Sequence, residues 1–104
     1  MSLSGLRVDH DRLSDVCRRY RVARLEVFGS FAEGDAEPDS DIDLLVTFDP
    51  GARIGLEFVA LQHELEAVLG RSVDLLTRAS VENSPNKYFR RFAIRRTQLL
   101  YEHA

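Results

Sequence analysis

The chain has 104 residues, of which 44% are hydrophobic and 30% are charged, and its formal net charge is -3. This length buries one small core, so we expect a single domain over residues 1–104, and the small negative charge gives no overall attraction to nucleic acid. The single cysteine excludes a disulfide framework and a cysteine metal site, and no apolar run is long enough for a membrane span or a signal peptide, so we expect a cytoplasmic protein with no membrane contact.

Apolar spacing predicts a helix over residues 9–20 and a strand over residues 23–28. Asp9 or Asp11 is expected to be the N-cap of the helix. In the strand, Leu25 and Val27 alternate with polar side chains, so one face of this strand should cover a core. The apolar positions of the helix, which recur at intervals of three and four residues, are Leu13, Val16, Cys17 and Tyr20.

A second strand is predicted to begin at Asp41-Ile42-Asp43 and to continue through an apolar run. Side chains two residues apart share one face of a strand, so Asp41 and Asp43 should lie together, opposite Ile42. Gly29-Ser30 follows the first strand as a tight turn, and a short helical turn is expected from Ser30. The acids at positions 35, 37 and 39 are typical of a solvated loop.

Three more elements complete the predicted order helix, strand, strand, helix, strand, helix. A helix over residues 55–69 ends at Gly70, a favourable C-cap, and a third strand over residues 72–76 contains Asp74. Ser84-Pro85 has the pattern of a helix start, which predicts a last helix to about Tyr101. This order is typical of an α/β (α+β) protein with helices packed on a small mixed sheet. The last helix should have a basic side, Lys87, Arg90, Arg91, Arg95 and Arg96, and an apolar side that includes Leu99 and Leu100.

Asp41, Asp43 and Asp74 lie in otherwise apolar strands, and parallel pairing of the second and third strands would bring them together, because neighbouring strands are about 4.8 Å apart. Carboxylates that converge in this way raise one another's pKa. Mg²⁺ relieves the repulsion, because it prefers carboxylate oxygens and keeps positions free for phosphate. Two such ions about 3.5 to 4 Å apart can hold the attacking and leaving oxygens of a phosphoryl displacement. Gly29 and Ser30 suit the same chemistry, since amides at the start of a helical turn and a hydroxyl bind phosphate.

The stretch from Gly29 to Val46, with Asp74, resembles the polymerase-beta-like nucleotidyltransferase superfamily, and within it the minimal nucleotidyltransferases. The resemblance covers roughly residues 10–101, and its specific motifs are Gly29-Ser30 and Asp41-Ile42-Asp43. It implies a polymerase-beta-like nucleotidyltransferase core in a short cytoplasmic protein. Such proteins are often the antitoxin half of a toxin–antitoxin pair whose partner is a HEPN-domain toxin.

The resemblance also implies a role for each motif residue. Asp41 and Asp43 would bind two Mg²⁺ ions, and Asp74 would complete the metal site and help to orient or deprotonate the attacking hydroxyl. Gly29 and Ser30 would hold the β and γ phosphates of ATP, the donor. The hydroxyl would attack the α-phosphate and pyrophosphate would leave. In the antitoxin group the hydroxyl is expected to belong to a tyrosine of the toxin.

The sequence departs from the family pattern at two positions. Many minimal members have arginine where this chain has Glu33, and often a second basic residue where it has Glu37. A carboxylate beside the triphosphate repels it. Either Arg24, Arg53 or a C-terminal arginine supplies the missing positive charge, or binding of the donor is weak.

Three functions are compatible with the sequence. The first is a Mg²⁺-dependent transfer of AMP to a hydroxyl of a partner protein, such as a HEPN-type toxin. The second is a binding module that neutralises its partner by forming a complex without catalysis. The third is transfer to a hydroxyl of a small molecule or an RNA end, which would need a further domain from a homo- or hetero-oligomer. The expected ligand is a nucleoside triphosphate, and direct binding of nucleic acid is not expected.

Overall fold

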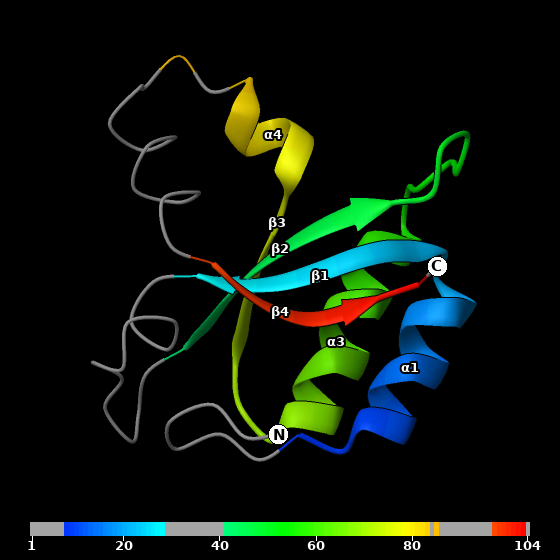
Figure 1. Ribbon diagram of the computed structural model, residues 1–104, viewed down its shortest axis with the longest axis vertical. Coiled ribbons are helices and arrows are strands. Elements are labelled where there is room, and N and C mark those ends of the chain that lie inside the picture. Colours follow the sequence, from blue (N-terminus) through cyan, green and yellow to red (C-terminus); the bar gives the residue numbers. More distant parts are fainter. Residues whose placement is uncertain (1–7, 29–40, 84, 86–96, 104) are drawn as a thin grey trace.

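The structure is a computed structural model, and it describes residues 8–28, 41–83, 85 and 97–103 (Figure 1). The elements are α1 (His10–Arg19), β1 (Val22–Phe28), β2 (Ile42–Phe48), α3 (Glu57–Leu69), β3 (Val73–Thr77), α4 (Arg78–Glu82) and β4 (Gln98–Glu102). The described strands form one sheet in the order β3-β2-β1-β4. β2 pairs with β3 in parallel, whereas β1 pairs antiparallel with β2 and with β4. The predicted mixed sheet packed by helices is confirmed.

Helices α1 and α3 lie side by side against one face of the sheet (Figure 1). The side chain of Asp9 accepts a hydrogen bond from the backbone amide of Arg12, so Asp9 is the N-cap of α1. The predicted apolar stripe of α1 and the apolar residues of α3 face the sheet, because burial of apolar surface drives their packing. The buried core on this side consists of Leu13, Val16, Cys17, Val22, Leu25, Val27, Ile42, Leu44, Val46, Leu61, Leu65, Leu69, Val73 and Leu75.

The opposite face of the sheet carries a second, smaller apolar cluster. Phe28 of β1, Leu45 of β2 and Val81 of α4 are buried there, and Leu76 of β3 packs against them. Thr77 begins α4 as its N-cap, because its hydroxyl accepts a hydrogen bond from the amide of Ser80 at 3.0 Å. Strand β2 therefore has one face of Ile42, Leu44 and Val46 under the long helices and another face on which Asp43 and Leu45 lie.

The prediction that the last helix continues to about Tyr101 is wrong at its C-terminal end. Residues 98–102 form strand β4, in which Leu99 pairs with Glu26 and Tyr101 pairs with Leu25 of β1. A short apolar run fits a helical stripe and a strand equally well, and pairing with the free edge of β1 decides for the strand. Ser84 and residues 86–96, which include the predicted basic side, lie outside the described residues.

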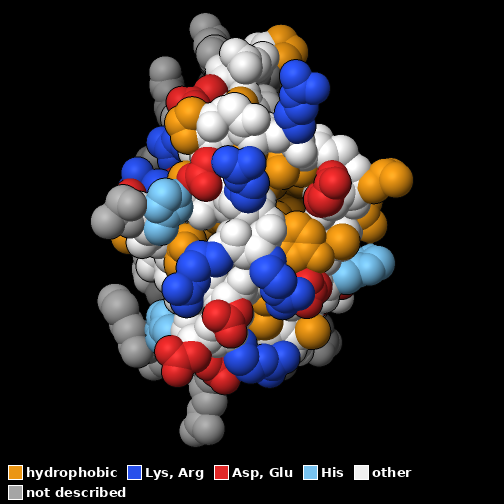
Figure 2. Space-filling model, turned by 90° about the vertical axis from the view of Figure 1, so that its right-hand side faces the viewer, with side chains coloured by type: hydrophobic (Ala, Val, Ile, Leu, Met, Phe, Trp, Pro, Cys, Tyr) orange, Lys and Arg blue, Asp and Glu red, His pale blue; other side chains and the backbone are white. Residues whose placement is uncertain are grey.

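Figure 2 shows the side of the molecule on which α1 of the helical layer and the loop between β2 and α3 lie, and this side mixes both signs of charge with exposed apolar side chains. On this layer Glu64 of α3 joins the two helices, because it pairs with Arg19 at 3.1 Å and accepts a hydrogen bond from the Tyr20 hydroxyl at 2.9 Å. Leu56 and Val59, near the start of α3, are 90% and 53% exposed. Across the described residues, no helix has both the length and the apolar composition to cross a membrane.

Candidate active site

Asp43 and Asp74 lie side by side on neighbouring strands. The parallel pairing of β2 and β3 places Asp43 directly opposite Asp74, as the alternation of the two strands predicted. On its other side Asp43 is paired with Phe28, the last residue of β1. Asp43 is half-buried and Asp74 is exposed, so the two carboxylates meet where the small apolar cluster borders solvent.

Asp41 lies one residue before β2 and is exposed. The amide of the next residue, Ile42, donates a hydrogen bond to the carbonyl of Ser72 at 2.9 Å, which fixes the start of β2 against the start of β3. Burial, and then the charges of Asp74 and Asp41, raise the pKa of Asp43 above its ordinary value. Asp74 and Asp41 are therefore both close enough to Asp43 to affect its ionisation.

The donor chemistry of this cluster fits a hard divalent cation. The carboxylates of Asp43 and Asp74 come from paired strand positions, and a positive charge there would oppose the repulsion that raises the pKa of Asp43. Among the described residues, no group of three or more acidic, histidine or cysteine side chains is placed to hold a metal ion. Mg²⁺ in proteins is usually held by one or two carboxylates together with phosphate oxygens and water, so the Asp43–Asp74 pair suits it.

Two residues of the predicted site and two acids near it in the sequence lie outside the described residues. They are Gly29 and Ser30, the predicted phosphate-binding residues, and Glu33 and Glu37. Of the basic residues expected to compensate for these acids, Arg24 and Arg53 are described and lie away from Asp43, whereas the C-terminal arginines lie outside the described residues.

Arg24 forms ion pairs with Glu26 at 3.6 Å and with Glu102 at 3.8 Å. Arg53 lines a surface pocket with Arg21, whose carbonyl accepts a hydrogen bond from Asp49 after the end of β2. Asp43 lies at the start of β2, so Arg53 is at the other end of that strand. Neither arginine is positioned beside the carboxylate pair.

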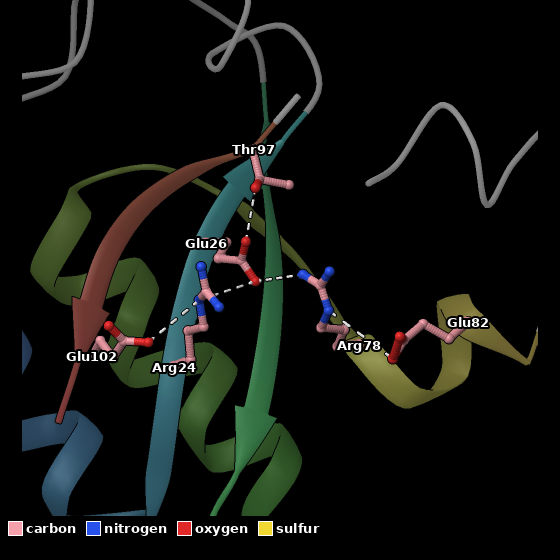
Figure 3. Close-up of polar contacts among 6 residues, drawn as sticks. All are labelled: Arg24, Glu26, Arg78, Glu82, Thr97 and Glu102. Atoms are coloured by element: carbon pink, nitrogen blue, oxygen red, sulfur yellow. Dashed lines mark hydrogen bonds and ion pairs between the residues drawn. The ribbon is translucent and has the colours of Figure 1, made fainter. Parts of the chain in front are cut away.

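Sequence reasoning missed Glu26, the most buried charged residue that the structure describes. Glu26 is 2% exposed and lies two residues before Phe28 on the same face of β1. Its carboxylate accepts hydrogen bonds of 2.7 Å from the Arg78 guanidinium and of 2.7 Å from the Thr97 hydroxyl (Figure 3). Glu26 alternates with apolar residues like any solvent-facing strand residue, and its partners are 52 and 71 residues away, so no local pattern marks it.

Comparison with known proteins identifies the family of the chain. The model of the nucleotidyltransferase domain family matches residues 11–100. The protein adenylyltransferase MntA of Thermococcus cleftensis is 42% identical over 65 residues, which are 62% of this chain and 65% of that protein. The matched part thus spans about two thirds of the relative's length.

Solved structures show the same fold. A candidate minimal nucleotidyltransferase, 35% identical, superimposes with a TM-score of 0.65 over 85% of each chain. A complex of a tri-AMPylated Shewanella oneidensis HEPN toxin with an MNT antitoxin matches with a TM-score of 0.51 and 19% identity, over 90% of this chain and 70% of the other. The carboxylate pair on β2 and β3, the mixed sheet and the family model agree, and the chain belongs to the nucleotidyltransferase domain family.

Proposed function

We propose that this protein transfers AMP from ATP to a hydroxyl of a partner protein, with Mg²⁺ bound at Asp41, Asp43 and Asp74. The observation that carries the proposal is the direct pairing of Asp43 with Asp74 across two parallel strands, next to Asp41. Bound Mg²⁺ would neutralise the phosphate charge that develops during transfer. Gly29 and Ser30 are proposed to hold the β and γ phosphates.

In the proposed reaction, the partner's hydroxyl oxygen attacks the α-phosphorus of ATP in line with the leaving group. The new bond joins this oxygen to the α-phosphorus, and the bond from the α-phosphorus to the bridging oxygen of pyrophosphate breaks. Asp74 orients the hydroxyl and accepts its proton, which its exposed position on β3 allows. The products are the AMP-modified hydroxyl and pyrophosphate.

The comparisons support AMP as the transferred group and a HEPN toxin as the partner. A relative is named a protein adenylyltransferase, and a structural neighbour is an MNT antitoxin in complex with a toxin that carries AMP groups. By this reasoning the protein acts as the antitoxin of a toxin–antitoxin pair in the cytoplasm. The acceptor of the proposed reaction is a tyrosine hydroxyl of the toxin.

Label transfer from ATP tests the proposal. ATP labelled at the α-phosphate is incubated with the protein, Mg²⁺ and an extract of the source cell, and labelled proteins are identified. We expect one labelled partner. Asp43→Asn should reduce labelling by more than about 100-fold. Removing a residue that only hydrogen-bonds to a metal ligand already reduces activity by up to about 100-fold, and Asp43 is proposed to bind the metal itself.

Asp15→Asn is the matched control, because Asp15 is a carboxylate on the surface of α1, with a side chain that is 73% exposed. We expect Asp15→Asn to label the partner to the same extent as the wild-type protein does. If no protein is labelled while the wild type and Asp43→Asn both capture the same partner, the function is binding without catalysis. Label on RNA or on a small molecule instead of a protein would replace the proposed acceptor.

A further inference from the structure

Asp74 lies on the edge of the sheet. Strand β3, which carries it, is the first in the order β3-β2-β1-β4, so β2 is its one neighbour in the described sheet. An edge strand has fewer hydrogen bonds to hold it than an inner strand. A carboxylate that must stay beside Asp43 to within a fraction of an ångström therefore needs other contacts that hold β3 in place.

The start of β3 is held by α3 on the helical face of the sheet. Gln62 of α3 donates a hydrogen bond to the carbonyl of Val73 at 3.0 Å. The amide of the same residue donates to the carboxylate of Glu66, also on α3, at 2.9 Å. Both contacts fix the backbone one residue before Asp74.

The end of β3 is held on the opposite face by Arg78. Arg78 is the first residue of α4, directly after β3, and its guanidinium reaches over β2 to the buried carboxylate of Glu26 on β1 (Figure 3). Leu45 of β2 lies between them in the sheet, because it pairs with Glu26 on one side and adjoins Leu76 of β3 on the other. The contact therefore ties an edge strand to an inner strand two positions away.

The Glu26–Arg78 contact is strong enough to resist displacement. The hydrogen bond measures 2.7 Å, and the side chain of Glu26 is 3% exposed. Moving Arg78 away would remove the shortest ion pair of this buried carboxylate and leave it with the Thr97 hydroxyl and the longer 3.6 Å pair with Arg24, so the displacement is disfavoured. Asp74 lies between the two anchors of β3.

We propose that the Glu26–Arg78 pair is a positioning device that holds β3, and with it Asp74, in register beside Asp43. The effect of this pair on metal binding rests on the proposed function, in which Asp43 and Asp74 bind the metal. Arg78 and Glu26 act through the strand and touch neither the substrate nor the reacting atoms.

Two measurements on Arg78→Gln test the proposal. The first is hydrogen exchange of individual backbone amides in the metal-free protein. The amides of β3 should exchange about tenfold faster, as expected for the loss of one buried charged hydrogen bond, while those of β1 keep their rates. The second is binding of Mn²⁺, followed by the signal of the free ion. The affinity for Mn²⁺ should fall about tenfold, the scale seen when a group that holds a metal ligand is removed.

Arg24→Gln is the matched control, because Arg24 also pairs with Glu26 but belongs to β1 itself and makes no contact with β3 that the structure describes. This variant removes a positive charge from the same carboxylate and should change neither measurement. If Arg78→Gln does not fold, Arg78→Lys keeps the charge, loses the planar guanidinium and should show the same changes to a smaller extent.

Unchanged exchange in β3 of the Arg78 variant would overturn the proposal. It would also be overturned if Arg24→Gln and Arg78→Gln had equal effects, since the pair would then only balance the charge of Glu26. Faster exchange with unchanged Mn²⁺ affinity would make the pair a purely structural contact. If the wild type binds no Mn²⁺, the proposed function is contradicted, and hydrogen exchange still decides whether the pair holds β3.

Discussion

Asp43 makes the stability of the metal-free protein depend on pH. Burial and the neighbouring acids raise its pKa above the ordinary value of 3.8, so the folded state binds this proton more tightly than the unfolded state. The free energy of unfolding therefore decreases as the pH rises from the ordinary pKa through the raised one. Above that window the ionised side chain destabilises the fold.

We predict that Asp43→Asn makes the metal-free domain more stable at neutral pH and removes this decrease. Urea unfolding of both proteins in a chelator, at several values from about pH 4 to about pH 7, measures the effect. Addition of Mg²⁺ should stabilise the wild type and leave the variant unchanged, because only the wild type gains a ligand in its folded state. A variant that unfolds more easily than the wild type at neutral pH would show that Asp43 is needed for the fold.

At this scale, the sequence predicts the acids that lie in apolar strands and misses those whose partners are distant. Asp43 and Asp74 could be placed on one face because Ile42 and Leu75 fix which face of each strand is buried. Glu26 alternates in the same way, and its burial is made possible by the positive charge of Arg78 and the hydrogen bond from the Thr97 hydroxyl. Because only the tertiary fold brings these partners to Glu26, no pattern in the neighbouring sequence predicts its burial.

A residue in the left-handed conformation lies at or just after the end of each long helix, and the residue type differs between the two. Gly70 ends α3 with φ 69°, where glycine costs little, whereas Arg21 follows α1 with φ 59°, where a side chain is strained. We predict that Arg21→Gly raises the free energy of unfolding by about 1 kcal/mol and that Gly70→Ala lowers it by about 1 kcal/mol. Urea unfolding measures both.

Gly55→Ala is the control for these changes, because Gly55 is not in the left-handed region and a side-chain carbon there would meet Glu57 at 3.7 Å, an ordinary contact. It should be close to neutral. If Gly70→Ala were as harmless as Gly55→Ala, the positive φ of Gly70 would not be a constraint on α3.

The elements themselves could be predicted where their periodicity was long and unambiguous. The stripes of α1 and α3 have apolar positions over several turns. Strand β1 begins one residue before its predicted start, β2 begins one residue after its predicted start, and β3 is displaced by one residue at both ends. The five residues of β4 are too few to separate a strand from a helix, and only the free edge of β1 selects between them. Helix α4 is equally short, and its start depends on a single hydroxyl, that of Thr77.

At the scale of the whole molecule, the reactivity of the Cys17 thiol shows whether the main core is intact. Its side chain is fully buried between α1 and the sheet, and burial raises the pKa of its thiol to about 12. Since the thiolate is the reactive form, we predict that iodoacetamide does not modify the folded protein at mildly alkaline pH and reacts once urea unfolds it. Mass spectrometry at increasing urea should give the same midpoint as the unfolding curve. Rapid modification without urea would show that the core opens locally.

The contacts of Glu26 also determine when the chain can complete its fold during synthesis. Arg78 and Thr97 follow Glu26 by 52 and 71 residues, and β4 pairs with β1 from the far end of the sequence. On the ribosome, β1 and β2 emerge long before these partners, and the carboxylate of Glu26 stays hydrated until they arrive. Closure of the sheet is therefore a late event, because contacts that are distant in sequence form slowly. A polypeptide released before Thr97 would lack β4 and one of the two side chains that donate hydrogen bonds to this carboxylate.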